Sequence, residues 1–148
     1  FFSGCCRIGA LLSHASDEQT DALAKYGLNG GIAFQIEDDL LDITGEELET
    51  GKTAQRDVTK SKPTLATIHL LGAVGASERA GVHALLDDPS RSRDALRRMF
   101  DLHGSLEYAC AQARHYVDRA IKALVAVPEG DGKDALIATA HFMADRKA

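Results

Sequence analysis

Apolar residues recur along this chain at the three- and four-residue spacing of amphipathic helices. The clearest case is the run from Leu106 to Leu124, which ends before Pro128. Another run covers residues 2–14. No stretch combines strict apolar–polar alternation with many β-branched residues, as a half-buried strand would. The pattern therefore predicts an all-α fold with roughly six to eight helices.

The longest predicted helix begins at a capping box. Ser16 is the expected N-cap, and Gln19 stands at the third helical position. From there the apolar pattern runs to about Ile43. Three glycines inside this helix each cost roughly 1 kcal/mol relative to alanine, so we expect close packing against a neighbour, with a kink or a substrate contact as alternatives. They are Gly27, Gly30 and Gly31.

The other elements are predicted from turn and capping signals. Residues 44–62 are polar and are expected to form a connection. Pro63 suits a first helical position, so a helix should begin there and continue or restart after Gly75. Residues 87–90 are expected to form a turn, and Ser92 should cap the next helix. A short last helix carries Leu136, Ala140 and Met143.

Composition narrows the class of protein. The chain has 148 residues, enough for one domain, with 45% hydrophobic and 26% charged residues. Its net charge of −5 argues against general nucleic-acid binding. The sequence has no run of 18 apolar residues, so no membrane span is predicted. The three cysteines, Cys5, Cys6 and Cys110, form no CxxC spacing, so reduced thiols in a cytoplasmic protein are expected.

Histidine and tyrosine offer no separate site in the sequence. The six histidines form no HxxxH or HxxE pair, and each is expected to be a satisfied surface or core residue. They are His14, His69, His83, His103, His115 and His141. The three tyrosines, Tyr26, Tyr108 and Tyr116, are expected to serve packing.

The chemically distinctive stretch lies near the end of the long helix. On a helix, Gln35, Asp38, Asp39 and Asp42 fall within an arc of about 100°. The rest of the surface is apolar, interrupted by Glu37 alone. It consists of Ile32, Phe34, Ile36, Leu40, Leu41 and Ile43. This pattern predicts a helix buried on most sides, with three carboxylates projecting into a cavity.

Three neighbouring carboxylates repel one another unless something neutralises them. No Lys or Arg lies within a helical turn, and oxygen ligands without Cys or His suit Mg²⁺, or Mn²⁺, rather than zinc. Because Mg²⁺ is usually completed by substrate phosphates, the stripe implies a phosphorylated ligand. A short DDxxD pattern alone is more often an acidic surface patch. Phe34 and Gln35 in front of it, with apolar residues around it, favour the metal site.

A cationic connection follows the acidic helix. It contains Lys52, Arg56, Lys60 and Lys62, with Asp57 among them. Folded back over the helix, such a loop would complete an alternation of carboxylate, metal, phosphate and lysine. The alternative is a solvated loop, which is the commoner fate of charged loops.

These residues together resemble the all-trans polyprenyl diphosphate synthases, the head-to-tail prenyltransferases that make farnesyl, geranylgeranyl and octaprenyl diphosphates. The resemblance extends over essentially the whole chain as the C-terminal half of such an enzyme. The string that carries it is Gly31-x-x-Phe34-Gln35-Ile36-x-Asp38-Asp39-x-x-Asp42, followed by Gly51-Lys52, Asp57, Lys62 and Thr64-Leu65. Residues 104–109 and the closing Phe142-x-x-x-Arg146 add to it.

The resemblance implies an isoprenoid-synthase-type helical bundle that condenses isopentenyl diphosphate with an allylic diphosphate. Asp38, Asp39 and Asp42 would hold the Mg²⁺ ions bridging to the allylic diphosphate, which Lys52 and Lys62 would grip. Phe34 and Gln35 would lie beside the substrate. Asp38 and the two lysines would be the catalytic residues, because they stabilise charge on the leaving group. A homodimer is also implied.

Some features depart from the family pattern. Ala66 stands where proline is usual, and Gln55-Arg56 replaces a glycine-containing spacing before Asp57. More importantly, the family's first aspartate-rich motif is absent, since it belongs to the N-terminal half. We therefore expect residues 1–148 to be the C-terminal portion of one synthase domain, inactive alone.

Two other functions remain open. One is a non-catalytic or regulatory subunit that keeps the fold and partners a complete synthase. The other is a class I terpene cyclase, against which Phe34-Gln35 and the lysine pair argue. The segment Thr64-Leu65-x-x-Ile68-His69 and the last helices lean toward medium- or long-chain products.

Overall fold

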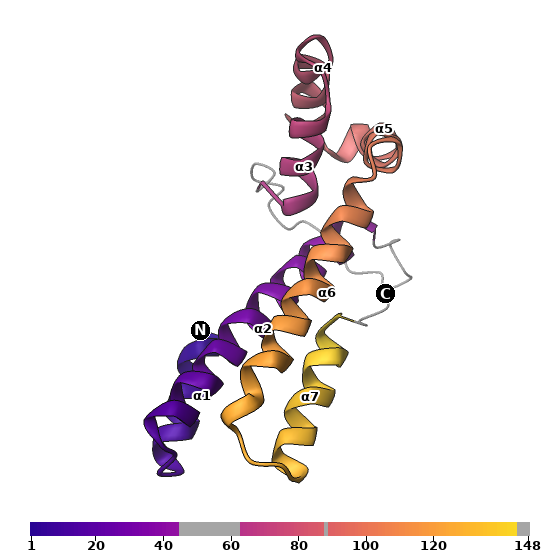
Figure 1. The fold of residues 1–148 in the computed structure, drawn as a ribbon. Coiled ribbons are helices and arrows are strands. Elements are labelled where there is room, and N and C mark those ends of the chain that lie inside the picture. Colours follow the sequence, from indigo (N-terminus) through magenta and orange to yellow (C-terminus); the bar gives the residue numbers. More distant parts are fainter. Residues whose placement is uncertain (45–62, 88, 145–148) are drawn as a thin grey trace, which may run out of the picture. The chain divides into compact units, whose positions relative to one another are not determined.

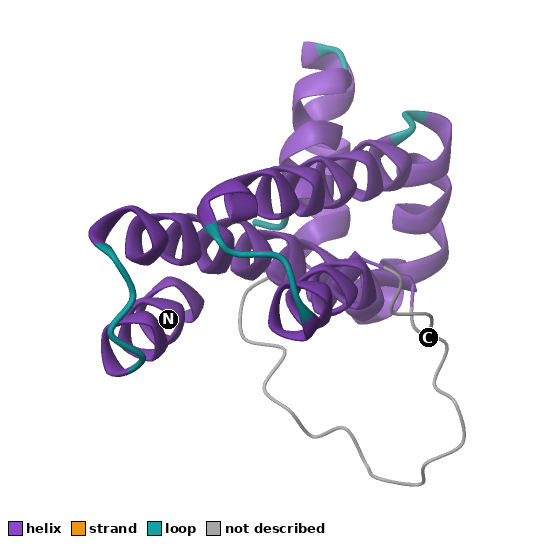
Figure 2. Ribbon diagram, turned by 60° about the horizontal axis from the view of Figure 1, so that its bottom comes forward, coloured by secondary structure: helices purple, strands orange, loops and turns teal. Residues whose placement is uncertain are grey.

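The computed structural model describes residues 1–44, 63–87 and 89–144. Within these ranges the secondary structure is helical, with no strand (Figures 1 and 2). The helices are α1 (Phe2–Leu12), α2 (Asp17–Thr44), α3 (Leu65–Ala73), α4 (Ala76–Asp87), α5 (Pro89–Leu102), α6 (Ser105–Ala123) and α7 (Asp131–Ala144), with a 3₁₀ turn, η1 (Leu124–Ala126). The predicted all-α fold is confirmed. None of the described helices is both long and apolar enough to cross a bilayer.

The chain divides into two compact units. The first comprises Phe1–Asp38 and the residues from Cys110 onward, and the second comprises Asp39–Ala109. The first unit therefore holds α1, most of α2, most of α6, η1 and α7. The second holds the end of α2, α3 to α5, and the start of α6.

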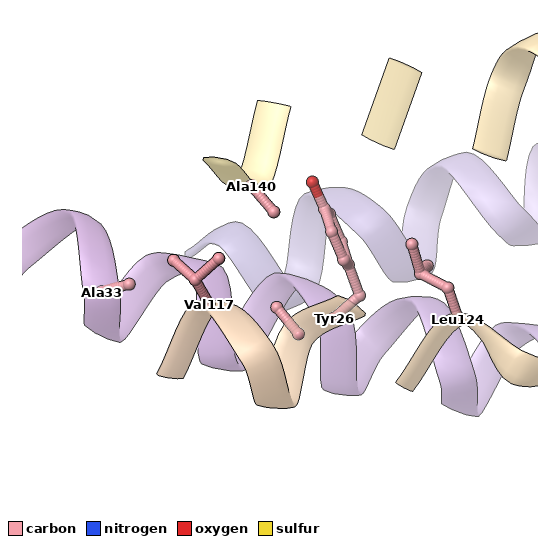
Figure 3. Close-up of a cluster of buried hydrophobic side chains, with 6 residues drawn as sticks. Tyr26, Ala33, Val117, Leu124 and Ala140 are labelled. Carbon is pink, nitrogen blue, oxygen red and sulfur yellow. The ribbon is translucent and has the colours of Figure 1, made fainter. Parts of the chain in front are cut away.

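The core of the first unit lies where α2, α6 and α7 meet (Figure 3). Small side chains allow the helices to approach closely, because Ala33, Ala120 and Ala140 are completely buried. Val117 and Leu124 fill the space between them, as the Leu106–Leu124 pattern predicts.

Tyr26 crosses this core from α2 toward α7 (Figure 3). Its hydroxyl donates a 2.7 Å hydrogen bond to the carbonyl oxygen of Leu136. Burial raises the pKa of the Tyr26 phenol to about 12, with a smaller contribution from nearby Cys6. The expected packing role is confirmed, with a hydrogen bond added.

The glycines of α2 are explained mainly by α1. A Cβ at Gly27 would lie 2.6 Å from the carbonyl oxygen of Phe2 and 2.8 Å from Cys6 Sγ. A Cβ at Gly31 would lie 3.1 Å from the Phe2 side chain. At Gly30 the nearest atom is Met143 Sδ, at an ordinary 3.4 Å. Close packing, the favoured explanation, is confirmed at Gly27 and Gly31.

The capping box at the start of α2 is present as predicted. Ser16 Oγ accepts a 3.2 Å hydrogen bond from the backbone N–H of Gln19. In return, the backbone N–H of Ser16 donates to Gln19 Oε1 over 3.0 Å. Two N–H groups with no partner inside the helix are thereby satisfied.

Two predicted boundaries in the second unit are wrong. α3 begins at Leu65 rather than Pro63, because Thr64 forms its own capping box with Thr67. α5 begins at Pro89 rather than after Ser92, so Pro89 and Ser90, which were expected in a turn, are helical. Proline fits a first helical position because it lacks the N–H that would have no partner there.

α3 is joined to α6 through His69. Its Nδ1 shares a 3.0 Å hydrogen bond with Ser105 Oγ, and its ring stacks on Tyr108 at 4.2 Å between centroids. These contacts confirm the satisfied histidine and the packing tyrosine expected at these positions. His103 differs, since its Nε2 is buried and has no hydrogen-bond partner within the part of the chain that the structure describes.

Candidate functional site

The last turns of α2 carry the predicted acidic stripe. The helix continues to Thr44, so Gln35, Asp38, Asp39 and Asp42 occupy successive positions on one regular element. Ala33, Ile36 and Leu40 on the same helix are buried. Around them, Ile32, Phe34, Leu41 and Ile43 are half-buried.

The carboxylates are exposed to different degrees. Asp38 and Asp39 are half-buried, whereas Asp42 is exposed. Glu37, which the sequence pattern treats as an interruption of the apolar side, is buried with 8% of its surface exposed. Glu37 therefore lies on the buried side of α2 and not in the acidic stripe. Burying a carboxylate is costly unless the protein compensates its charge.

The spacing of the aspartates limits what they can bind alone. Asp38 and Asp42 lie one turn apart on the same side of α2, and Asp39 lies about 100° around the helix. Among the described residues no three His, Cys, Asp or Glu side chains converge as a metal site. The donors still have the all-oxygen chemistry that suits Mg²⁺. α2 can therefore supply only part of a complete ligand set.

Lys52 and Lys62 cannot be placed against this stripe. Both belong to residues 45–62, outside the described ranges, as do Arg56, Asp57 and Lys60. The predicted folding of this cationic connection over the acidic helix stays a prediction.

Next to the stripe, α1 and α2 enclose a groove of about 480 Å³. Phe34 and Gln35 line it, and the Phe2 ring lies 5.4 Å from the Phe34 ring between centroids. The other lining residues are Phe1, Ser3, Gly27, Leu28, Gly31, Ile32 and Ile36. Along α2 the lining ends at Ile36, so the three aspartates lie beyond it. Phe34 and Gln35 thus line this groove, whereas the projection of the three carboxylates into a cavity stays a prediction.

The α1 side of this groove was not found from the sequence. Phe1, Phe2 and Ser3 read only as the start of an apolar helix. A usable signal was present in Gly27 and Gly31, which are four residues apart and therefore face the same neighbour. That neighbour is α1, since Phe2 is the residue nearest to both glycines.

The arrangement suits an amphipathic ligand. Apolar walls can hold a hydrocarbon chain, and Gln35 stands at the end of the groove from which the carboxylates follow. With a rise of 1.5 Å per residue, Asp38 follows Gln35 by about 4.5 Å along the helix axis, and Asp42 by about 10 Å. A ligand with its apolar tail in the groove and an anionic head could reach Asp38 only through a bridging divalent cation, because a carboxylate repels an anion.

Comparison with known proteins places the chain in a family. A model of the polyprenyl synthetase family matches residues 1–103. The geranylfarnesyl diphosphate synthase of Aeropyrum pernix is 37% identical over 132 residues, which make up 86% of this chain and 40% of that protein.

Solved structures give the same result. The geranylgeranyl pyrophosphate synthetase of Pyrococcus horikoshii matches 99% of this chain and 45% of its own, with a TM-score of 0.85 and 27% identity. The polyprenyl synthase of Caulobacter crescentus, solved with calcium and isoprenyl diphosphate, matches 99% of this chain and 46% of its own. Its TM-score is 0.84 and its identity 29%.

Fold and sequence therefore define an all-α protein of the isoprenoid-synthase type. Within that class, the chain belongs to the polyprenyl synthetase family. The resemblance drawn from the sequence is confirmed. The chain spans less than half the length of the relatives named above.

Proposed function

We propose that this chain is the C-terminal portion of a prenyltransferase that condenses isopentenyl diphosphate with an allylic diphosphate. The observation that carries the proposal is the juxtaposition on α2 of the apolar groove, lined by Phe34 and Gln35, with the carboxylates that follow it. Family membership and the names of the relatives support the same chemistry.

In this proposal the residues divide between the two ends of the substrate. Phe34 and the groove walls hold the allylic hydrocarbon and exclude water, and Gln35 lies at the reacting end. Asp38, Asp39 and Asp42 hold Mg²⁺, with Mn²⁺ as a substitute, together with ligands from outside the described residues. Bound there, the metal would neutralise charge on the leaving diphosphate. The Caulobacter crescentus relative holds calcium, a cation that also prefers oxygen ligands.

The reaction we propose begins with cleavage of the allylic C–O bond, whose electron pair leaves with the diphosphate. Lys52 and Lys62 stabilise the charge that develops on it. The isopentenyl double bond then attacks the allylic cation and forms the new C–C bond. The departing diphosphate finally takes the proton that restores a double bond. Dry walls such as those at Ile32 and Ile36 protect the cation from water.

We further propose that the complete protein is a cytoplasmic homodimer, and that residues 1–148 alone do not turn over substrate. The diphosphate is stabilised by metal ligands from both halves of the synthase domain, and this chain supplies only one half. It therefore provides only part of the stabilisation that the leaving group needs. Product chain length is left open by this proposal.

The test uses the polypeptide in which the N-terminal half of the synthase domain precedes this chain. Asp38→Asn and Lys62→Ala should each lower kcat by roughly 10²-fold or more, because each removes charge stabilisation from the leaving group. Asp101→Asn and Lys122→Ala, at exposed positions of α5 and α6, are the matched controls and should leave kcat unchanged.

Product analysis separates this proposal from the alternatives. Elongated prenyl diphosphate, formed only with Mg²⁺ present, supports it. A cyclic product would indicate a terpene cyclase. Absence of any product, restored by adding a complete synthase, would indicate a non-catalytic subunit. Near-normal rates in both variants would contradict the roles given to Asp38 and Lys62.

A further inference from the structure

The Phe2 side chain forms part of the α1 wall of the groove. It belongs to the first turn of α1 and is half-buried. Its ring centroid lies 5.4 Å from that of Phe34, with the two ring planes tilted by 41°. A Cβ at Gly31 would lie 3.1 Å from the Phe2 side chain, so the ring fills space that Gly31 leaves open on α2. Phe2 therefore takes up part of the width that a bound hydrocarbon could use.

The backbone of Phe2 is held against α2. Its carbonyl oxygen lies only 2.6 Å from where a Cβ at Gly27 would stand, so the two backbones are in close contact. In the next residue, Ser3 Oγ donates a 2.9 Å hydrogen bond to the carbonyl oxygen of Ala24. α1 cannot carry the ring away from α2 without losing both contacts. A wall built on packed helices holds its shape better than one built on a loop.

The groove offers a ligand mainly hydrocarbon contacts. Among the described residues that line it, only Ser3 and Gln35 carry polar side chains. The Ser3 hydroxyl is already bonded to Ala24, and Gln35 lies at the end from which the acidic stripe follows. A surface of this kind distinguishes its ligands by size and shape rather than by hydrogen bonding.

The Phe2 ring lies partway along the path of a hydrocarbon chain that begins at the acidic end. Along the axis of α2, Gly31 is about 6 Å and Gly27 about 12 Å from Gln35, at a rise of 1.5 Å per residue. A short chain that begins at Gln35 ends near Gly31, where the ring stands. A longer chain has to pass the ring to reach Gly27. Because close-packed side chains yield only at a cost, the ring opposes the longer chain.

We infer that Phe2 limits the length of the allylic hydrocarbon that this groove accepts, and is thus a specificity-determining residue. The inference rests on the proposed function in taking the groove as the site of the allylic chain. It adds a residue of this chain that discriminates between allylic substrates of different length. A phenyl ring occupies about the space of one isoprenoid unit, so its removal should admit a chain longer by one unit.

The test measures binding to the polypeptide in which the N-terminal half of the synthase domain precedes this chain. The ligands are the slowly reacting thiolodiphosphate analogues of geranyl, farnesyl and geranylgeranyl diphosphates, which differ by one isoprenoid unit each. They would be titrated calorimetrically with Mg²⁺ and without isopentenyl diphosphate. Phe2→Ala should raise the affinity for the longest chain relative to the shortest by at least about 10-fold. Phe2→Trp enlarges the ring and should lower the same ratio.

The matched controls are Leu102→Ala and Leu102→Trp, which make the same changes at a 76% exposed apolar position of α5. Both should leave the affinity ratio unchanged. A merely loosened α1 would weaken the binding of all three ligands together, whereas a wall that limits length shifts the ratio in opposite directions in the two Phe2 variants.

Two results would overturn the inference. One is an affinity ratio that stays unchanged in both Phe2 variants, and the other is a loss of affinity equal for all three chain lengths. Binding is measured without condensation, so the proposed function is tested separately. A shifted ratio in a polypeptide that forms no elongated product would contradict the proposed function and support the role of Phe2. Elongated product with an unshifted ratio would overturn the role of Phe2 alone.

Discussion

Burial of one phenol makes Tyr26 a source of pH-dependent stability. Its pKa of about 12 exceeds the unfolded value of about 10, so the folded state holds the proton more tightly. The stabilisation is complete below pH 10 and is lost as the pH rises from 10 to 12. Tyr26→Phe should therefore show a smaller fall in unfolding free energy over that range, measured by urea denaturation. Parallel curves for the two proteins would contradict the shift.

At Gly27 the constraint is steric. Gly27→Ala would place a Cβ 2.6 Å from the carbonyl oxygen of Phe2, and backbone cannot move aside as a side chain can. We expect a loss of about 1–3 kcal/mol in thermal unfolding as α1 shifts away from α2. Gly81→Ala on α4 is the control, because nothing lies within 4 Å of its added Cβ. That variant should be stabilised by roughly 0.5–1 kcal/mol, and an equal loss in both would argue against the tight contact.

Whole helices were predictable where the deciding interactions are local. The Ser16–Gln19 capping box and the apolar run ending near Leu124 depend only on residues a few positions apart. The wrong boundaries at Pro63 and Ser92 arose where two signals competed within a few residues. Thr64 with Thr67 caps α3 after Pro63, and Pro89 begins α5 before Ser92. Propensity alone does not decide between such neighbours.

The junction of α3 with α6 gives a prediction at this scale. His69→Ala removes both the hydrogen bond to Ser105 and the stack on Tyr108. It should destabilise the protein by about 1.5–3 kcal/mol, and Ser105→Ala by about 1 kcal/mol. The double variant should cost less than the sum, because the two changes remove one shared hydrogen bond. His83→Ala, at an exposed position of α4, should be neutral in the same denaturant titrations, and additivity would contradict the junction.

For the molecule as a whole, the sequence predicts candidate chemistry more readily than shape. Asp38, Asp39 and Asp42 can be singled out as candidate metal ligands because their spacing is a property of one helix, and this role stays a prediction. The groove was not predicted, because it depends on how closely α1 approaches Gly27 and Gly31. Such an approach of two helices is a tertiary contact that the local pattern does not report. Convergence of ligands is likewise a tertiary property, and the described residues provide no complete metal group.

An incomplete ligand set has a measurable consequence for residues 1–148 alone. We expect them to bind inorganic diphosphate with Mg²⁺ at a Kd of about 1 mM, roughly −4 kcal/mol, because one helix supplies part of the donors. No elongated product should form from isopentenyl and allylic diphosphates. Asp38→Asn combined with Asp42→Asn should remove the Mg²⁺ dependence of binding in calorimetry. Asp101→Asn with Asp118→Asn, both exposed, should not. Micromolar binding by the chain alone would mean that these carboxylates need no opposing ligands, and would contradict the proposal that residues 1–148 are inactive because they supply only part of the ligands.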